Sequence, residues 1–296
     1  MISIREAAER IRAGEVVAFP TETVYGLGAN ALDAAAVAKI YELKGRPASS
    51  PLIVHVASIE MARTLVNEWP PEAEELACRY WPGPLTLVLP KMPAIPDIVT
   101  AGLPTVGLRV PDHPLALALI REAGVPLAAP SANRFMGLSA TTAEHVRETF
   151  GDVVPVLDGG PCQVGIESTV LSINAGKITV LRPGMISIED GERANAPPTD
   201  AAHPAPGMHP RHYSPRTLLV LSNEPDPRGA YVWATRSAHA AHSVQMPSTP
   251  EPYAARLYSV LHDLDREGWP IISVEPLPDT VEWAAVRDRL QRAASK

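Results

Sequence analysis

Cysteines, clustered histidines and long apolar runs are scarce in this 296-residue sequence, and each absence excludes a class of protein. Two cysteines, Cys78 and Cys162, lie far apart without a CxxC spacing, which excludes a disulfide framework and a zinc site. No apolar run approaches the roughly 18 residues of a membrane span, and the N-terminus reads as an amphipathic helix rather than a signal peptide. We therefore expect a cytoplasmic protein without a resident metal.

An excess of positive charge is also missing, because 26 Lys and Arg face 33 Asp and Glu, for a formal charge of −7. This balance argues against a protein that coats nucleic acid, so any tRNA contact is expected to be local. Hydrophobic residues make up 46% and charged residues 20%, which is ordinary for a globular protein. The length favours two domains.

Residues 1–190 alternate between apolar runs rich in strand formers and amphipathic segments with helix caps. This alternation predicts an α/β domain. Strands are expected at 16–19, 52–56, 85–89, 105–110, 153–157, 169–173 and 178–181, helices at 4–13, 34–44, 59–69, 71–80, 114–123 and 142–149, and a loop at 21–30. Residues 191–215 are rich in proline and lack a hydrophobic period, so they read as a linker. Residues 216–296 alternate again and predict a small, mostly parallel, Rossmann-like α/β domain.

Two short patterns near the N-terminus suggest phosphate binding without requiring it. Gly26 and Gly28 lie between a strand and a helix, where open α/β sheets bind ligands. The third glycine of GxGxxG and the phosphate loop GxxxxGK[ST] are both missing, so a tight turn explains the glycines better than dinucleotide binding does. Lys44 and Arg46 follow a helix, where the helix dipole alone favours cations.

Two strands carry polar residues opposite their apolar face. His55 lies opposite Val54 and Val56, although a lone strand histidine is more often a satisfied core residue than a ligand-binding one. Arg109 shares a face with Thr105. An arginine on a central strand needs an anion, which can be a buried carboxylate of the protein or a carboxylate or phosphate of a substrate.

Further polar residues stand at strand ends, where turns and caps are the simplest explanation. The longer motifs follow one another in the order PTETVYGLG, KGRP, PLIVHV, WPGPLTLVL, TVGLRVPDHP, APSAN, ESTV, LRPG and PGMHPRHYSP. In this order they resemble the YrdC-type threonylcarbamoyl-AMP synthases, in the long form with an additional C-terminal domain. The likeness covers nearly the whole chain.

The resemblance implies a YrdC-like twisted α/β domain with a basic concave cavity. It also implies an enzyme, a nucleotidyltransferase that forms threonylcarbamoyl-AMP and pyrophosphate from L-threonine, bicarbonate and ATP for tRNA modification. Mg²⁺ would accompany the ATP, and the product would pass to a tRNA threonylcarbamoyl transferase complex. No membrane partner is implied.

The resemblance also assigns site residues, motif by motif. Threonine would be surrounded by Thr23, His55, Arg109, Ala129 and Ser168, and ATP by Lys44, Arg46, Ser50, Thr105, Ser131, Asn133, Ser139, Arg182 and Tyr213. Lys44 and Arg46 would be catalytic, because cations neutralise the charge that spreads over phosphate oxygens. The chain departs from the family at Ser50, where relatives usually carry asparagine, and at residues 134–138.

The end of the linker contains Met208, Arg211, His212 and Tyr213 around a proline, which a passive tether does not need. We expect residues 207–215 to close over the first domain, with Tyr213 on the nucleotide and Arg211 near its phosphates, and residues 194–206 to stay mobile. The C-terminal domain would chiefly anchor this lid.

Three alternatives stay open. An RNA-binding module is disfavoured by the negative charge and by the lack of an aromatic and basic RNA motif. A carbamoyltransferase on the same fold generally carries additional catalytic domains. A catalytically silent relative would not need the cationic residues.

Overall fold

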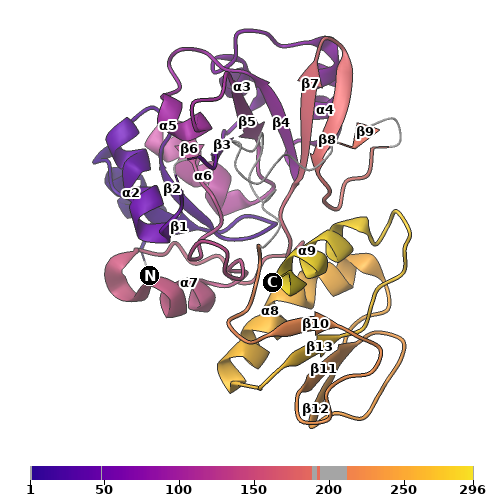
Figure 1. The fold of residues 1–296 in the computed structure, drawn as a ribbon. Coiled ribbons are helices and arrows are strands. Elements are labelled where there is room, and N and C mark those ends of the chain that lie inside the picture. Colours follow the sequence, from indigo (N-terminus) through magenta and orange to yellow (C-terminus); the bar gives the residue numbers. More distant parts are fainter. Residues whose placement is uncertain (1, 48, 189–191, 194–211, 296) are drawn as a thin grey trace.

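The computed structural model describes residues 2–47, 49–188, 192–193 and 212–295, and two sheets divide these residues into two domains (Figure 1). Within the described chain the first sheet has nine strands, in the order β1-β2-β6-β3-β5-β4-β7-β8-β9. The pairs β3–β5, β4–β7 and β8–β9 are parallel, and the other pairs are antiparallel. The predicted α/β first domain is therefore confirmed, with a mixed sheet.

The elements of the first domain follow the caps and apolar runs of the sequence. Its strands are β1 (Val17–Phe19), β2 (Gly26–Asn30), β3 (Ile53–His55), β4 (Leu85–Pro90), β5 (Thr105–Arg109), β6 (Leu127–Ala128), β7 (Thr169–Asn174), β8 (Lys177–Arg182) and β9 (Glu192–Arg193). Its helices are α1 (Ile4–Arg12), α2 (Ala34–Lys44), α3 (Ile59–Arg63), α4 (Pro71–Tyr80), α5 (Asp97–Thr100), α6 (Pro114–Ala123), α7 (Ala143–Phe150) and the 3₁₀ helix η1 (Gly151–Val153).

The predicted loop at residues 21–30 is partly wrong, because its second half is strand β2, which pairs antiparallel with β1. The two glycines of this strand pack against the ring of Phe19. A Cβ atom on Gly28 would lie 2.6 Å from a ring carbon of Phe19, closer than real Cβ contacts. Close packing therefore explains the glycine here, and the dinucleotide interpretation is not needed.

Two other predicted elements differ from the structure. The helix expected at 59–69 ends at Arg63, because the chain then leaves the helix to form a single bridge between Val66 and Lys91. The strand expected at 153–157 is absent from the described chain, where η1 is followed by one bridge from Val156 to Ala18. Pro155 has no N–H to donate, which prevents a continuous ladder.

Helices cover both faces of the first sheet. Val17 and Phe19 pack in one apolar cluster with residues of α1 and α6, whereas the intervening Ala18 belongs to the larger cluster with α2, α4 and α7. Alternate strand residues thus serve opposite cores, as the two-residue period of a strand requires. The ends of the strands are not covered by these helix layers, so they remain available for a ligand-binding site.

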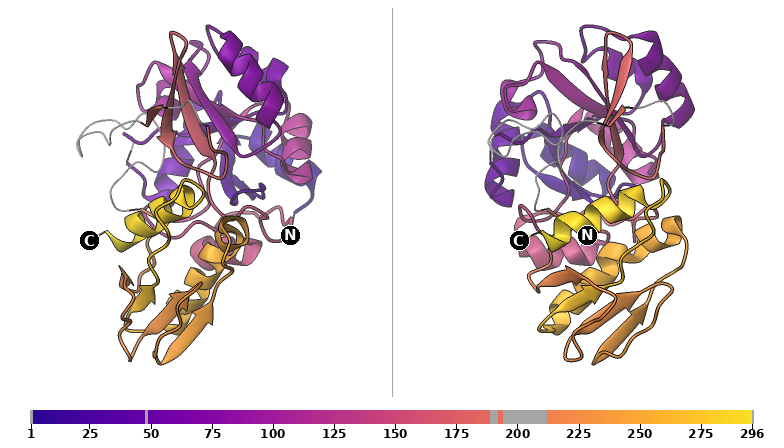
Figure 2. Two further views of the ribbon diagram at one scale, coloured as in Figure 1. Left: turned by 90° about the vertical axis from the view of Figure 1, so that its right-hand side faces the viewer. Right: turned by 45° about the vertical axis from the view of Figure 1, so that its right-hand side comes forward.

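The C-terminal domain is a small α/β unit, as predicted. Its elements are β10 (Leu219–Leu221), β11 (Ala230–Trp233), β12 (His242–Gln245), β13 (Ile272–Val274), α8 (Pro250–Glu267) and α9 (Ala284–Ala294). The described sheet has the order β10-β13-β11-β12, and each pair is parallel. Helices α8 and α9 lie between this sheet and the first domain (Figure 1 and Figure 2).

The two domains share an apolar core. Val24, Leu138 and Ile166 of the first domain cluster with residues of α8 and α9. Gly165 permits this approach, since it has a φ of +77° and a Cβ there would lie 2.5 Å from the Ala254 carbonyl oxygen. Of the predicted linker 191–215, residues 191 and 194–211 lie outside the described residues, and β9 adds residues 192–193 to the first sheet.

Candidate active site

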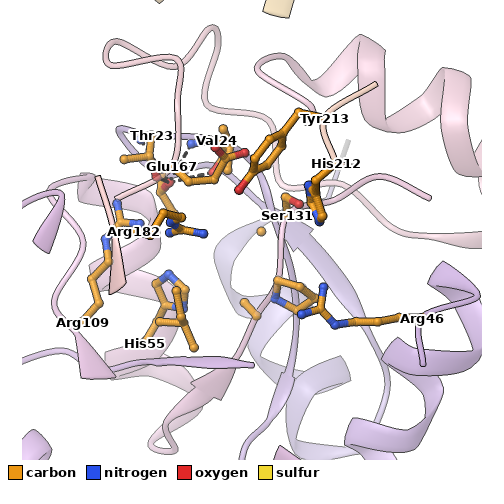
Figure 3. Close-up of a pocket in the computed structure, with 15 residues that line it drawn as sticks. Thr23, Val24, Arg46, His55, Arg109, Ser131, Glu167, Arg182, His212 and Tyr213 are labelled. Carbon is orange, nitrogen blue, oxygen red and sulfur yellow. Dashed lines mark hydrogen bonds between the residues drawn. The ribbon is translucent and has the colours of Figure 1, made fainter. Parts of the chain in front are cut away.

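A cavity of about 50 Å³ that opens to solvent lies where the strand ends of the first domain face the start of the C-terminal segment (Figure 3). Its lining residues come from widely separated segments: Thr21, Thr23, Val24, Gly26, Arg46, Ile53, His55, Arg109, Ala129, Pro130, Ser131, Glu167, Arg182, His212 and Tyr213. Arg109, Arg182 and His55 lie on one side of the cavity, and Arg46 lies on the other.

The positions of His55 and Arg109 follow from strand pairing. Strands β3 and β5 are parallel neighbours, and their last residues, His55 and Arg109, are register partners. The carboxyl ends of parallel strands meet at one edge of a sheet, so both side chains reach the same cavity. Thr105 begins β5 and therefore lies about 13 Å from Arg109, at the other end of the strand.

The guanidinium of Arg109 has a carboxylate partner within the protein. An Nη2 of Arg109 lies 2.7 Å from Oε2 of Glu22, and both side chains are buried. The Nε of Arg109 donates to the Gly83 carbonyl oxygen at 3.3 Å.

His55 is neutral at physiological pH. Burial, and then the nearby charge of Arg109, lower the pKa of His55 to about 3. Its Nδ1 atom is buried without a hydrogen-bond partner among the described residues, while its ring contacts the edge of Phe19 at a centroid distance of 5.9 Å. A neutral imidazole with an unpaired nitrogen suits an uncharged hydrogen bond to a ligand.

The KGRP motif places one cation in the cavity and one beneath it. Arg46 lines the cavity and donates to the carbonyl oxygens of Ser50 and Pro51. Lys44 instead donates to the carbonyl oxygens of Ser131 and Asn133, each at 2.6 Å. Burial lowers the pKa of Arg46 to about 10 and lowers the pKa of Lys44 well below its usual value, with the Arg46 charge adding to the effect on Lys44.

Glu167 supplies the carboxylate of the cavity wall. It accepts hydrogen bonds from the Ser139 hydroxyl at 2.5 Å and the Tyr258 hydroxyl at 3.1 Å, and Nε of Arg289 lies 2.7 Å from its Oε2. Burial raises the pKa of Glu167, but the charges of Arg289 and Arg182 outweigh it and hold the pKa below its usual value. Glu167 is therefore ionised.

Arg182 lies on the same wall and holds the preceding motif in place. Its Nε donates to the carbonyl oxygen of Ser168 and its Nη2 to the Ser168 hydroxyl, each at 3.1 Å. Burial lowers the pKa of Arg182. Ser168 also contacts the Thr86 hydroxyl at 2.8 Å, so it is a partner of Arg182 beside the cavity.

The structure brings together most of the site residues predicted from the sequence. Eight of them line the cavity: Thr23, Arg46, His55, Arg109, Ala129, Ser131, Arg182 and Tyr213. Five are buried beside or beneath it: Lys44, Ser50, Asn133, Ser139 and Ser168. Thr105 is the one that lies away from it, half-buried at the start of β5. Of the predicted lid 207–215, the structure describes residues 212–215, of which His212 and Tyr213 line the cavity; Arg211 lies outside the described residues.

Three charged residues of the site were missed from the sequence. Glu22 and Glu167 lie in the PTETVYG and ESTV motifs, whose hydroxyl residues were predicted as ligand-binding residues instead. Arg289 lies on the apolar face of α9 with Val286, Leu290 and Ala293. A cation on the buried face of an amphipathic helix was a signal that could have found it.

Two negative observations apply to the described residues only. They contain no cluster of three or more His, Cys, Asp or Glu side chains placed to hold a metal ion. They also contain no helix that is long and apolar enough to cross a membrane.

Comparisons with known proteins identify the family to which this chain belongs. The family model described as "Telomere recombination" (Sua5, YciO and YrdC) matches residues 9–184, and the model described as "Threonylcarbamoyl-AMP synthase, C-terminal domain" matches residues 170–295. The threonylcarbamoyl-AMP synthase of Pyrococcus abyssi is 41% identical, over 98% of this chain and 94% of its own. The chain belongs to the threonylcarbamoyl-AMP synthase family.

Other relatives agree with this membership. The threonylcarbamoyl-AMP synthase of Bacillus subtilis is 43% identical, over 98% of this chain and 92% of its own length. The crystal structure of P. abyssi Sua5 complexed with L-threonine superposes with a TM-score of 0.92, over 98% of this chain and 94% of that chain, at 41% identity. A threonylcarbamoyl-AMP synthase fold with both domains is therefore established for this chain.

Proposed function

We propose that this chain is an L-threonylcarbamoyladenylate synthase, a nucleotidyltransferase that makes threonylcarbamoyl-AMP from L-threonine, bicarbonate and ATP. One observation carries the proposal: three buried arginines, Arg46, Arg109 and Arg182, converge on one cavity from distant segments. The described residues offer Arg46 no ion pair. Buried cations are costly without anions. Arg109 already pairs with Glu22, and a threonine carboxylate together with a triphosphate would bring further anions to the cavity. The complex of P. abyssi Sua5 with L-threonine supports this assignment.

The chemistry needs positioning rather than a protein nucleophile. The threonine amine combines with bicarbonate to give a carbamate and water. A carbamate oxygen then attacks the α-phosphorus of ATP, and the bond to pyrophosphate breaks. Arg46 and Arg182 would neutralise charge on the phosphate oxygens. Arg109 would hold the threonine carboxylate, and neutral His55 would accept a hydrogen bond from threonine.

We expect Mg²⁺ to arrive with ATP, because this ion keeps several water and phosphate ligands and needs few from the protein. The Ser131 hydroxyl is an oxygen atom in the cavity wall that would hold it, whereas the Glu167 carboxylate is already bound by Ser139, Tyr258 and Arg289. When bound, Mg²⁺ would neutralise part of the triphosphate charge. Closure by the segment that carries Tyr213 would exclude water from the reactive carbamoyl phosphate anhydride.

The product would serve threonylcarbamoyladenosine modification of tRNA, through a tRNA threonylcarbamoyl transferase complex. The mixed anhydride hydrolyses readily, so a transferase that consumes it must act soon after release. The cytoplasmic location and any local tRNA contact stay predictions.

The decisive assay measures pyrophosphate release with ATP, L-threonine and bicarbonate together, and with each omitted. Synthesis requires release to depend on all three and a new product with the mass of threonylcarbamoyl-AMP. Pyrophosphate release that is independent of threonine would contradict the proposal and favour a carbamoyltransferase on another substrate. Absence of turnover with retained tRNA binding would favour an RNA-binding module.

A further inference from the structure

Arg289 of the C-terminal domain reaches into the first domain behind the cavity. Its side chain is completely buried, although it belongs to α9, the last helix of the chain (Figure 1). Arg289 lies on the apolar face of α9 that packs against the first domain, so its guanidinium extends across the domain interface. A buried guanidinium on such a face has to be paired, because its desolvation costs free energy.

Arg289 pairs with Asp288 of its own helix at 2.8 Å, and its other hydrogen-bond partners belong to two motifs of the first domain. Its Nε donates to Oε2 of Glu167 at 2.7 Å and its Nη2 to the Glu167 carbonyl oxygen at 3.2 Å. Its Nη1 donates to the carbonyl oxygen of Pro183 at 3.0 Å. Glu167 precedes Ser168, and Pro183 follows Arg182, so one guanidinium joins the same two segments that Arg182 joins.

The same guanidinium also supports the ring of Tyr213. The Cζ atom of Arg289 lies 5.2 Å from the centre of this ring, within the range of a cation–π contact. Tyr213 is buried and has a left-handed φ of 58°, which persists only where the surroundings hold it. In Figure 3 the ring of Tyr213 and the carboxylate of Glu167 lie side by side at the cavity.

The charge of Arg289 changes what Glu167 does to the cavity. Glu167 is an ionised carboxylate in a wall that has to receive anions, and Arg182 is the other cation whose field lowers its pKa. Asp288 also lies beside Arg289, but it pairs with Arg292 at 3.0 Å as well. The positive charge of Arg289 therefore compensates Glu167 from outside the cavity. Without Arg289, Glu167 would repel an anionic substrate and draw Arg182 away from it.

We propose that Arg289 is a positioning residue for the substrate site, acting through Glu167 and Tyr213. The C-terminal domain thereby completes the cavity wall instead of only anchoring a lid. This inference rests on the proposed function for the identity of the anionic substrates, ATP and threonine. The geometry of the contacts stands independently of it.

The test compares Arg289→Met and Arg289→Lys with a matched control, Arg287→Met. Arg287 lies on the same helix and pairs with Asp279 at 2.7 Å within the C-terminal domain. We expect Arg289→Met to raise the KM for ATP and threonine at least about tenfold in the full-length protein, a clear loss of substrate binding. Arg289→Lys should raise the KM values less than Arg289→Met, because lysine keeps the positive charge but lacks the bidentate geometry of a guanidinium. Arg287→Met should keep both KM values.

A purely structural role predicts a different result. Loss of folded protein lowers the apparent kcat and the melting temperature and leaves both KM values unchanged, which would overturn the proposal. A double-mutant cycle with Glu167→Gln adds a second criterion, since Arg289→Met should have little further effect on KM when the carboxylate is gone. Fully additive effects would contradict action through Glu167.

Direct binding of ATP, measured by calorimetry, separates this inference from the proposed function. If the wild type binds ATP but makes no threonylcarbamoyl-AMP, the proposed function fails while weaker ATP binding by Arg289→Met still supports the inference. If the wild type makes product and both Arg289 variants keep its KM values, the inference alone fails. Should Arg289→Met not fold, the KM values of Arg289→Lys decide.

Discussion

Arg109 and Glu22 form a buried ion pair with an N–O distance of 2.7 Å, directly behind the candidate active site. The pair joins the TVGLRV strand to the PTETVYG segment. From the sequence, the anion near Arg109 could be a protein carboxylate or a substrate. The structure shows the protein carboxylate, and Arg109 also lines the cavity, so the residue has both a structural partner and access to a ligand.

This double role predicts how Arg109 variants behave. Arg109→Ala leaves Glu22 buried and uncompensated, which should cost about 3–5 kcal/mol of unfolding free energy. Arg109→Ala should also raise the KM for threonine steeply. Arg109→Lys should bind threonine poorly as well, because lysine cannot form the bidentate contact of a guanidinium with a carboxylate. The double variant Arg109→Met with Glu22→Gln should regain stability, measured by urea unfolding, without regaining threonine affinity. Full recovery of threonine affinity would mean that Arg109 serves Glu22 only.

Lys44 and Arg46 should respond differently to removal of their charge. Lys44 binds two backbone carbonyl oxygens of the APSAN loop and Oδ1 of Asn133. Lys44→Met should therefore lower the free energy of unfolding by about 1.5–3 kcal/mol for each of these charge-assisted hydrogen bonds that it removes. Arg46→Met should lower pyrophosphate release much more than it lowers the melting temperature. Equal losses of stability with normal catalysis in both variants would reduce the KGRP motif to a structural role.

Removal of the C-terminal domain should inactivate the first domain. Truncation after residue 190 exposes Val24, Leu138 and Ile166 and leaves Glu167 without Arg289 and Tyr258. We expect aggregation, or a folded fragment with no threonine-dependent pyrophosphate release. A soluble fragment with full activity would contradict this.

The aromatic ring of Tyr213, rather than its hydroxyl group, should support ATP binding and stability. Tyr213→Ala removes a buried aromatic side chain from the cavity wall, which typically costs about 3–5 kcal/mol. We expect it to weaken ATP binding and product yield, whereas Tyr213→Phe keeps the ring contact with Arg289 and most of the stability. Calorimetry with ATP and thermal unfolding check the two effects separately. The companion variant Arg211→Ala tests the lid residue that lies outside the described chain.

A stacked histidine pair should make the domain interface sensitive to acid. His145 of α7 and His262 of α8 stack at 3.9 Å, and burial, then their mutual charge, lowers the pKa of His145 to about 3, while burial lowers the pKa of His262. Charged groups around the pair are Arg266, Glu148 and Asp265. The unfolded chain binds protons below about pH 6.5, so this contribution to stability is present above pH 6.5 and falls as pH decreases toward 3.

The matched comparison for this pH effect is His262→Gln against His239→Gln, an exposed histidine of the same domain. The melting temperature of His262→Gln should fall less between pH 7.5 and 5.5 than that of the wild type. The melting temperature of His239→Gln should fall as much as that of the wild type. Identical pH profiles for all three proteins would remove the histidine pair from the acid response.

Elements with strong local signals could be predicted from the sequence. Asp33 and Gly45 bound α2 through a side-chain cap and a left-handed residue, and both were recognised from residue type alone. Elements that depend on distant partners were not. Strand β2 exists because the β1 backbone pairs with it and because Gly28 fits under Phe19, and neither condition is visible in a local period.

The sequence by itself determined the α/β alternation, the family and most residues of the cavity, because short motifs carry residue types and spacings that do not depend on a fold. Only the tertiary structure decided how the charges are shared. It placed Glu22 behind Arg109, set Lys44 beneath the cavity, and brought Arg289 to Glu167, 122 residues away in the chain. Charge pairing depends on distance and burial in three dimensions, and chain separation does not limit it.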